Sequence, residues 1–187
     1  SVVRSHSRPR SSESMVPPAR GAVRADATSY GHPARPGGPA AAGADALVLF
    51  NRFYQPDIEI SDLTVLPNLN LSVPAEIRLP LLWIAALYGQ VPASLAATTG
   101  VHGARELIKY LLVGADVAMC ASGLLKNGIA WIRTVLDDLE LYMKDMPFQS
   151  VGAFKGSMSR RNIADPSAYE RSNYIAILQK KHALYRP

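Results

Sequence analysis

The amino-acid sequence predicts an α/β fold, in which helices alternate with the strands of a parallel sheet. The 187 residues are 48% hydrophobic, which is ample for a core. The composition changes abruptly at Gly43. From there, short apolar runs alternate with segments in which apolar residues recur at helical spacing. We therefore expect residues 44–187 to form the folded part of the chain.

Residues 1–43 have a different composition. They contain no Leu, Ile, Phe, Trp or Lys, and 32 of them are Ala, Ser, Arg, Pro or Gly. Such a segment buries too little apolar surface to offset the entropy lost on ordering, so we expect it to be disordered. Its six arginines and two acidic residues carry most of the net charge of +5. The rest of the chain is nearly neutral and lacks the basic footprint of a nucleic-acid-binding protein.

The cysteine content and the apolar runs indicate the compartment. Cys120 is the single cysteine, which excludes an intrachain disulfide and a cysteine-based zinc site. The longest apolar run, residues 79–87, is far shorter than the roughly 20 residues that cross a bilayer. The N-terminal segment also lacks the apolar core of a secretory signal. We expect a cytoplasmic protein that binds neither membranes nor nucleic acid.

Three apolar runs predict buried parallel strands, because strands covered on both faces read as near-continuous hydrophobic sequence. They are residues 46–50, 94–98 and 117–121. Apolar residues spaced by three and four predict three helices. These helices span residues 75–88, 103–113 and 129–143. Asp165 followed by Pro166 predicts the start of a last helix that reaches about Lys181.

A short repeat marks two junctions between a helix and a strand. Gly-Ala-Asp occurs at residues 43–45 and again at 114–116, each time directly before an apolar strand. Each glycine is predicted to end a helix in the left-handed conformation. The interval between the copies holds about two βα units, and the strand at residues 94–98 is the intermediate one.

Residues 56–73 interrupt the alternation of predicted strands and helices, because their apolar residues alternate with polar ones at period two. This pattern predicts a short antiparallel excursion between a strand and its helix. The excursion follows the carboxyl end of a parallel strand, where α/β proteins build their binding sites.

Two loops after neighbouring strands contain glycines and hydroxyl groups, residues 97–103 and residues 121–123. Glycine allows a tight turn, and the free amides at the start of the following helix favour an anion such as phosphate. Each loop alone also fits an ordinary βα turn. Together they match the phosphate site that (β/α)₈ barrels build after strands 7 and 8, and both interpretations stay open from the residues alone.

Other candidate groups are few. Asn51 directly follows the strand at residues 46–50, and its amide suits a flat heterocycle, although a turn-forming asparagine is the alternative. The four histidines lie far apart, and no sequence pattern of a metal site or a nucleophile triad is present. Cys120 lies in an apolar run and is predicted to be a buried small hydrophobe.

Taken with these loops, residues 43–129 resemble the C-terminal part of the dihydroorotate dehydrogenase-like flavoproteins, which are FMN-binding (β/α)₈ barrels. Residues 44–57 are similar to strand 6 and its loop, and the similarity continues through residues 156–179. The resemblance implies a partial TIM (β/α)₈ barrel that contains strands 6 to 8. It also implies FMN as the cofactor and oxidation of dihydroorotate to orotate in pyrimidine biosynthesis, with a pyrimidine-like small molecule as substrate.

The resemblance assigns six cofactor-binding positions, namely Asn51, Ser72, Thr99, Gly100, Ala121 and Ser122. It places Asn51 near the flavin and the substrate, and Ser72 in a loop that approaches the flavin. Thr99 with Gly100, and Ala121 with Ser122, occupy the positions at which the family contacts the phosphate. Three positions depart from the family pattern, because Ser72 lacks flanking glycines and Thr99 and Ala121 replace glycines.

The resemblance begins at strand 6, so the family's strand-5 lysine and its Cys or Ser base have no counterpart, and no catalytic residue is assigned. The composition of residues 1–43 is also what GC-rich coding DNA yields in a wrong reading frame; a genuine extension is the alternative. We expect a fragment that has little activity alone. The rival hypotheses are a non-catalytic half barrel that binds a phosphorylated ligand or a partner chain, and a flavin-free phosphate-binding barrel enzyme.

A barrel of this kind takes about 250 residues, so we expect it not to close within this chain. The strands at residues 46–50 and 117–121 would then keep unpaired edges, and residues 1–43 are not expected to supply a strand. Unpaired apolar edges favour association. This predicts a homo-oligomer or a second chain that completes the barrel.

Overall fold

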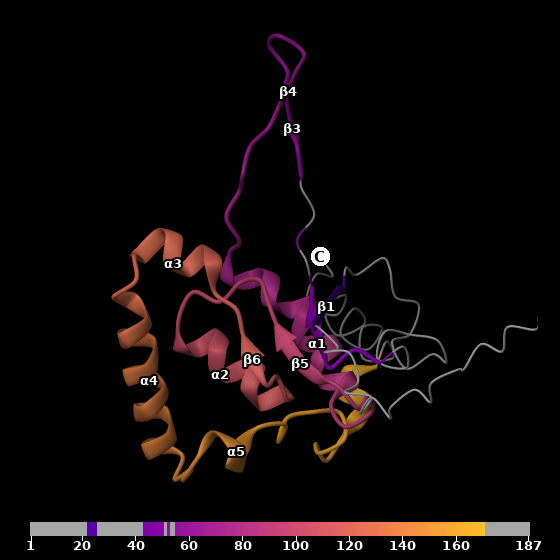
Figure 1. Cartoon of the computed structure of the whole chain (residues 1–187), viewed down its shortest axis with the longest axis vertical. Helices are drawn as coiled ribbons and strands as arrows, with labels where there is room; N and C mark the ends of the chain where they lie inside the picture. The colour runs from indigo at the N-terminus through magenta and orange to yellow at the C-terminus, as the bar shows by residue number, and fades with distance from the viewer. Residues whose placement is uncertain (1–21, 26–42, 51, 53–54, 171–187) are drawn as a thin grey trace, which may run out of the picture.

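The computed structural model describes residues 22–25, 43–50, 52 and 55–170. Its main sheet has four parallel strands in the order β1-β2-β5-β6 (Figure 1). The strands are β1 (Ala22–Ala25), β2 (Ala46–Leu49), β5 (Ser94–Ala97) and β6 (Val117–Ala118). Parallel neighbours need crossover connections, and helices supply them between β2 and β5 and between β5 and β6. The predicted mixed α/β fold with a parallel sheet is therefore confirmed.

Helices follow the strands along the chain. The helical elements are η1 (Pro74–Ile77), α1 (Arg78–Leu87), α2 (Ala104–Val113), α3 (Ala121–Asn127), α4 (Trp131–Asp145), α5 (Val151–Phe154) and η2 (Pro166–Tyr169). Helix α1 contacts β2 and β5, α2 contacts β6, and the two helices contact each other, so they lie side by side on one face of the sheet. Among the described residues, no helix is both long enough and apolar enough to cross a bilayer.

The core lies between the sheet and these two helices. Leu47 is in register with Leu95, and Leu49 with Ala97, so all four side chains share one face of the sheet. They pack with buried side chains of α1 and α2, including Ile84 and fully buried Tyr110. Val48 points to the opposite face because side chains alternate along a strand. One face of β2 therefore packs in the core, and the other face, which carries Val48, points away from it.

Both glycines of the Gly-Ala-Asp repeat have the predicted left-handed φ, and the helix expected to end at Gly43 lies outside the described residues. Gly43 has a φ of 91° and Gly114, which ends α2, has a φ of 112°. A Cβ atom on Gly114 would lie 2.1 Å from the ring of Tyr88. Glycine is thus required at residue 114 both for the left-handed turn and for the close packing of Tyr88.

The predicted antiparallel excursion is also confirmed. Strand β3 (Asp57–Glu59) pairs with β4 (Thr64–Leu66) in a two-stranded antiparallel sheet. Figure 1 shows this hairpin extending far from the rest of the molecule. We call residues 57–66 the projecting hairpin.

Two predicted elements are shorter in the structure. The strand expected over residues 117–121 pairs only at Val117 and Ala118, because the chain enters helix α3 at Ala121. Val117 is 54% exposed, since β6 is an edge strand of the described sheet. At the last predicted helix, the Asp165 carboxylate accepts the Ser167 N–H, but the turn is 3₁₀ and ends at Tyr169. Residues 171–181 lie outside the described residues.

The expectation of an unpaired edge on β2 is wrong. Ala22–Ala25 forms β1 and pairs in parallel with β2, in register from Ala22↔Ala46 to Ala25↔Leu49. The composition argument missed this strand because parallel pairing uses backbone N–H and C=O groups and needs no large side chain. The other residues before Gly43 lie outside the described residues, and the boundary of a disordered segment stays a prediction.

Deleting residues 1–43 should therefore weaken the sheet. The deletion removes β1 and leaves one edge of β2 without backbone partners. We expect several-fold faster hydrogen exchange of the β2 amides, with a smaller change in β6 on the far side of β5, as measured by mass spectrometry of peptides. Equal exchange of β2 in the two chains would contradict the pairing.

Candidate functional site

A cavity of about 440 Å³ lies where β2, β5 and β6 end. Its volume is within the range of ligand-binding pockets, about 300–1,000 Å³. The described residues that line it are Val48, Arg52, Ser72, Thr98, Thr99, Gly100, Val101, Met119, Cys120, Ala121, Ser122 and Leu124. Most of them directly follow a strand. The cavity therefore occupies the carboxyl edge of the parallel sheet, where open α/β sheets bind ligands.

The structure brings most of the predicted site residues together. Ser72, Thr99, Gly100, Ala121 and Ser122 all line the cavity, although they come from three separate segments of the chain. Asn51 lies outside the described residues, and its neighbour Arg52 lines the cavity. That these residues bind a cofactor remains a prediction.

Ser72 joins the segments around the cavity. Its hydroxyl accepts a hydrogen bond from the Gly100 N–H at 3.2 Å, and its own N–H donates to Ser122 Oγ at 3.1 Å. Its carbonyl oxygen lies 2.7 Å from His102 Nε2. Ser72 is buried, so these bonds replace the water that its polar groups would otherwise contact. Ser72 thus connects the segment between the projecting hairpin and η1 to the loops after β5 and β6.

The backbone after β5 turns sharply at two successive residues. Thr99 has a φ of 83° and Gly100 a φ of 77°. The second position requires glycine, because a Cβ there would lie 2.5 Å from Ile77 Cγ2 and 3.0 Å from the Ile77 backbone nitrogen. At the first position, a β-branched threonine occupies a conformation that glycine adopts without strain. The tight turn brings the chain back against η1 and forms one wall of the cavity.

A buried tyrosine of helix α2 holds this turn by hydrogen bonds. The Tyr110 hydroxyl donates towards the carbonyl oxygens of Thr99 at 2.8 Å and Thr98 at 3.3 Å. Burial, and secondarily the charge of Glu106, raises the pKa of Tyr110. The hydroxyl therefore keeps its proton and remains a donor across the neutral range.

Arg52 supplies positive charge, and it is the single charged residue among the described residues that line the cavity. Its guanidinium pairs with Glu76 at 3.1 Å and donates to the Asn70 carbonyl oxygen. The sequence analysis missed this residue. The signal that could have found it is its position directly after Asn51, at the carboxyl end of a predicted strand.

Cys120 is placed differently from the prediction. It is only partly buried, directly precedes α3 and lines the cavity, whereas a buried strand position was expected. Burial raises the pKa of its thiol, which keeps the nucleophilic thiolate scarce at neutral pH. The described part of the chain also has no cluster of three or more metal-ligating side chains.

Helix α3, which begins at Ala121, packs with its backbone at Gly123 close to Trp131 and to the Val101 carbonyl oxygen. A Cβ on Gly123 would lie 2.5 Å from the Trp131 ring and 2.8 Å from the Val101 carbonyl oxygen. The predicted loop of residues 121–123 is instead the first turn of α3, packed against the loop after β5. The cavity thus combines hydroxyl and backbone donors, one cation and an apolar wall. These groups suit a ligand that has an anionic group and a flat or apolar part.

Substitutions at the tight turn should have opposite effects on stability. Gly100→Ala introduces a side chain at positive φ and a clash with Ile77, so we expect it to lower the free energy of unfolding by about 1–3 kcal/mol or more. Thr99→Gly removes the strain at the neighbouring residue and should leave stability unchanged or raise it by up to about 1 kcal/mol. Urea denaturation measures both. Similar losses in the two variants would show that the turn is not strained as described.

Tyr110→Phe should lower the free energy of unfolding by about 1–3 kcal/mol, because two carbonyl oxygens lose a buried donor. It should also change the response to alkali. Above pH about 10 the unfolded chain releases the Tyr110 proton while the native chain keeps it, so the wild type loses stability as pH rises, by up to about 1.4 kcal/mol per unit. The variant lacks this contribution. Parallel pH curves for the two proteins would contradict the assignment.

The fold is similar to that of DHODH from Eimeria tenella. The complex of that protein with ferulenol superposes with a TM-score of 0.50 and 16% identity, covering 63% of this chain and 32% of that chain. The ligand-free type gives a TM-score of 0.49 and 18% identity, covering 61% and 32%. This chain thus spans about a third of the length of these structures. No protein-family model and no curated protein matches the sequence. The superposition on the ferulenol complex shows a DHODH-like fold.

Proposed function

We propose that this chain is the FMN-binding C-terminal part of a dihydroorotate dehydrogenase-like (β/α)₈ barrel, in which β2, β5 and β6 are strands 6, 7 and 8. The observation that carries the proposal is the cavity at the carboxyl ends of these three strands, whose loops after β5 and β6 are joined through Ser72. Barrels of this class place a phosphate at the loops after strands 7 and 8. The DHODH-like fold supports the same arrangement.

The residues fit a phosphate group. The backbone at Thr99 has a glycine-like φ, so replacing the family's glycine by threonine preserves the turn. The Ser122 hydroxyl accepts from Ser72, which leaves its proton for a ligand. Arg52 lines the cavity and shares its charge between Glu76 and a bound anion, and the amides at the start of α2 follow the loop after β5 and favour an anion on the same side of the sheet. Phosphate oxygens would find both neutral donors and a cation there.

The rest of the cavity fits a flat ring. Val48, Val101, Met119 and Leu124 give it an apolar lining beside the polar groups. When bound, FMN supplies the hydride-accepting N5 that the oxidation of dihydroorotate to orotate uses. The residues of this chain would bind the phosphate, orient the ring and exclude water from it. The resemblance places the proton-abstracting base earlier in the barrel than strand 6, so no catalytic role is proposed for a residue of this chain.

A non-catalytic half barrel is the second candidate. It would hold a phosphorylated ligand or a partner chain without chemistry, and the exposed edge of β6 favours it. The two candidates differ in whether the bound ligand is a flavin. Yellow colour with flavin absorbance in the purified protein distinguishes them.

We expect FMN to bind at least roughly tenfold more tightly than riboflavin, because riboflavin lacks the phosphate. Ser122→Asp should weaken FMN by a similar factor through charge repulsion and should leave riboflavin affinity nearly unchanged. The matched control is Ser157→Asp, at an exposed serine that does not line the cavity. Titrations that follow flavin fluorescence measure the affinities of the wild type and of both variants for the two flavins. Equal affinity for FMN and riboflavin would rule out a phosphate site.

A further inference from the structure

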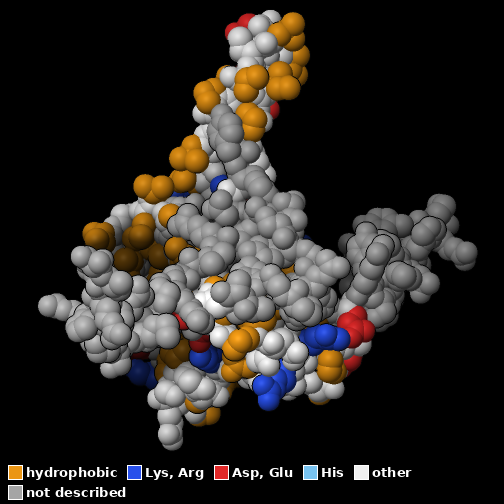
Figure 2. Space-filling view, turned by 45° about the vertical axis from the view of Figure 1, so that its right-hand side comes forward, with side chains coloured by type: hydrophobic (Ala, Val, Ile, Leu, Met, Phe, Trp, Pro, Cys, Tyr) orange, Lys and Arg blue, Asp and Glu red, His pale blue; other side chains and the backbone are white. Residues whose placement is uncertain are grey.

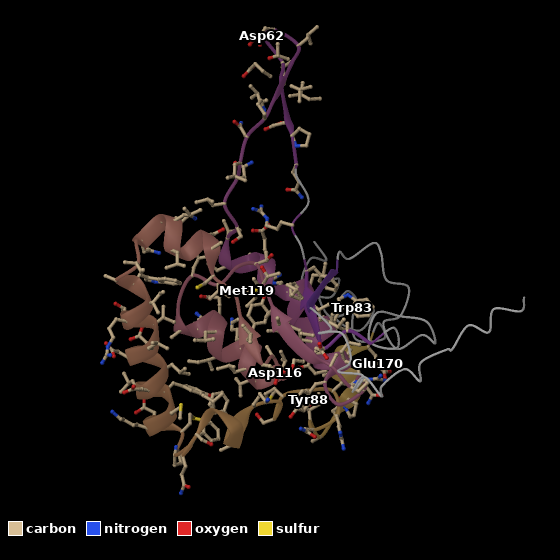
Figure 3. All side chains as sticks on the ribbon, viewed as in Figure 1. Asp62, Trp83, Tyr88, Asp116, Met119 and Glu170 are labelled. Carbon is tan, nitrogen blue, oxygen red and sulfur yellow. The ribbon has the colours of Figure 1, made fainter. Side chains whose placement is uncertain are left out.

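A second, smaller cavity lies at the amino edge of the sheet, with a volume of about 210 Å³. The described residues that line it, which we call the arginine site, are Ala86, Gln90, Arg160, Arg161 and Pro166. Gln90 lies between the end of α1 and the start of β5. Figure 3 shows Tyr88, at the end of α1, on the Asp116 side of β6, whereas Met119 of the first cavity follows that strand. The two cavities are therefore separate.

Positive charge gathers at the arginine site. Arg160 and Arg161 are adjacent, and residues 146–164 contain no Asp or Glu. Figure 2 shows Lys and Arg side chains at the end of the molecule opposite to the projecting hairpin. The Arg160 guanidinium pairs with Glu170 at 2.8 Å, but the two side chains are 51% and 47% exposed, so water competes for this contact and it contributes little. Arg160 therefore stays available to an anion in the cavity.

Arg161 is positioned by close packing, and its charge is unpaired. A Cβ atom on Gly89 would lie 2.6 Å from Arg161 Nη1 and 3.1 Å from Arg161 Cδ, so the absence of a side chain at residue 89 makes room for this arginine. Gly89 has a φ of 71°, which glycine adopts without strain. Within the described part of the chain, the Arg161 guanidinium has no carboxylate partner and no hydrogen bond. Its forked N–H donors are therefore free for a ligand.

The end of α1 does not consume the charge of the two arginines. Basic side chains often bind the last carbonyl oxygens of a helix, but here backbone amides occupy three of them. The N–H groups of Tyr88, Arg160 and Gln90 donate to the carbonyl oxygens of Ile84, Ala85 and Leu87, respectively. The bond from Arg160 to Ala85, at 3.0 Å, also fixes the backbone of the arginine pair against α1. The nearby Asp165 carboxylate accepts two hydrogen bonds from Ser167.

We propose that the arginine site binds a phosphate group, either as the free ion or as the ester of a small molecule. Two guanidinium groups offer forked pairs of donors that match phosphate oxygens, and the Gln90 amide adds a neutral donor. The volume is below the roughly 300 Å³ at which pockets for larger organic ligands begin, so the cavity takes the anionic group itself. The arginine site shares no residue with the first cavity, and it is independent of the proposed function.

Titration of the full, ¹⁵N-labelled chain with inorganic phosphate tests the site by NMR. Amide shifts of residues 88–91 and 158–163 should give a Kd of roughly 1 mM or tighter. Phosphate in the first cavity would shift residues 98–103 instead, so the two sites are read separately and failure of the FMN proposal leaves this test intact. Glycerol 3-phosphate as a second titrant distinguishes the sources, because the tighter binder shows whether the site takes an ester or the free ion.

Variants test the two arginines. Arg160→Gln/Arg161→Gln should raise the phosphate Kd at least roughly tenfold, and Arg161→Lys should raise it several-fold because lysine lacks the fork. Both arginines are exposed, so the melting temperature should not change. The matched control, Arg133→Gln/Lys144→Gln, removes the same charge from exposed positions of α4 and should bind as the wild type does. The proposal is overturned if phosphate shifts neither segment, if the glutamine pair or Arg161→Lys binds as tightly as the wild type, or if the control loses equal affinity.

Discussion

The parallel pairing of β2 with β5 is the constraint on which the site depends. The register runs from Ala46↔Ser94 to Leu49↔Ala97, so the two strands end at the same level. Strand β6 continues the alignment, with Ala97 opposite Ala118. The residues that follow the three strands therefore reach one edge of the sheet, although they lie far apart in the sequence. A shift of this register would move every loop residue relative to the cavity and exchange the two faces of β2.

Hydrogen bonding and backbone strain then shape the cavity. Ser72 reaches the site from the segment that follows the projecting hairpin, and it bonds to Gly100 and Ser122 from the two neighbouring strands. Thr99 is held at positive φ between this contact and the hydroxyl of Tyr110. Strained residues persist where the surroundings over-determine them, as they do at many binding sites. The same excursion thus supplies Ser72 to the cavity and carries an apolar surface far outside it.

The sequence by itself determined the class of fold and the position of the site along the chain. Apolar runs and helical spacing predicted strands β2, β5 and β6 and helices α1, α2 and α4, because the burial of one face imposes a periodicity that is readable in one dimension. The two Gly-Ala-Asp junctions and the antiparallel excursion were predicted for the same local reasons. The two glycine- and hydroxyl-containing loops hold four of the predicted site residues that line the cavity, Thr99, Gly100, Ala121 and Ser122, and the family resemblance added Ser72.

Only the tertiary structure decided the rest. Strand β1 was missed because its pairing uses the backbone alone, and Ala121 enters a helix because Gly123 allows α3 to pack against Val101. Neither effect leaves a periodic signal in the sequence. The salt bridge and hydrogen bond of Arg52 and the hydrogen bonds of Ser72 join residues separated by 18 to 50 positions in the chain. Such long-range contacts arise only when the strands align, because spacing along the chain does not specify distance in space.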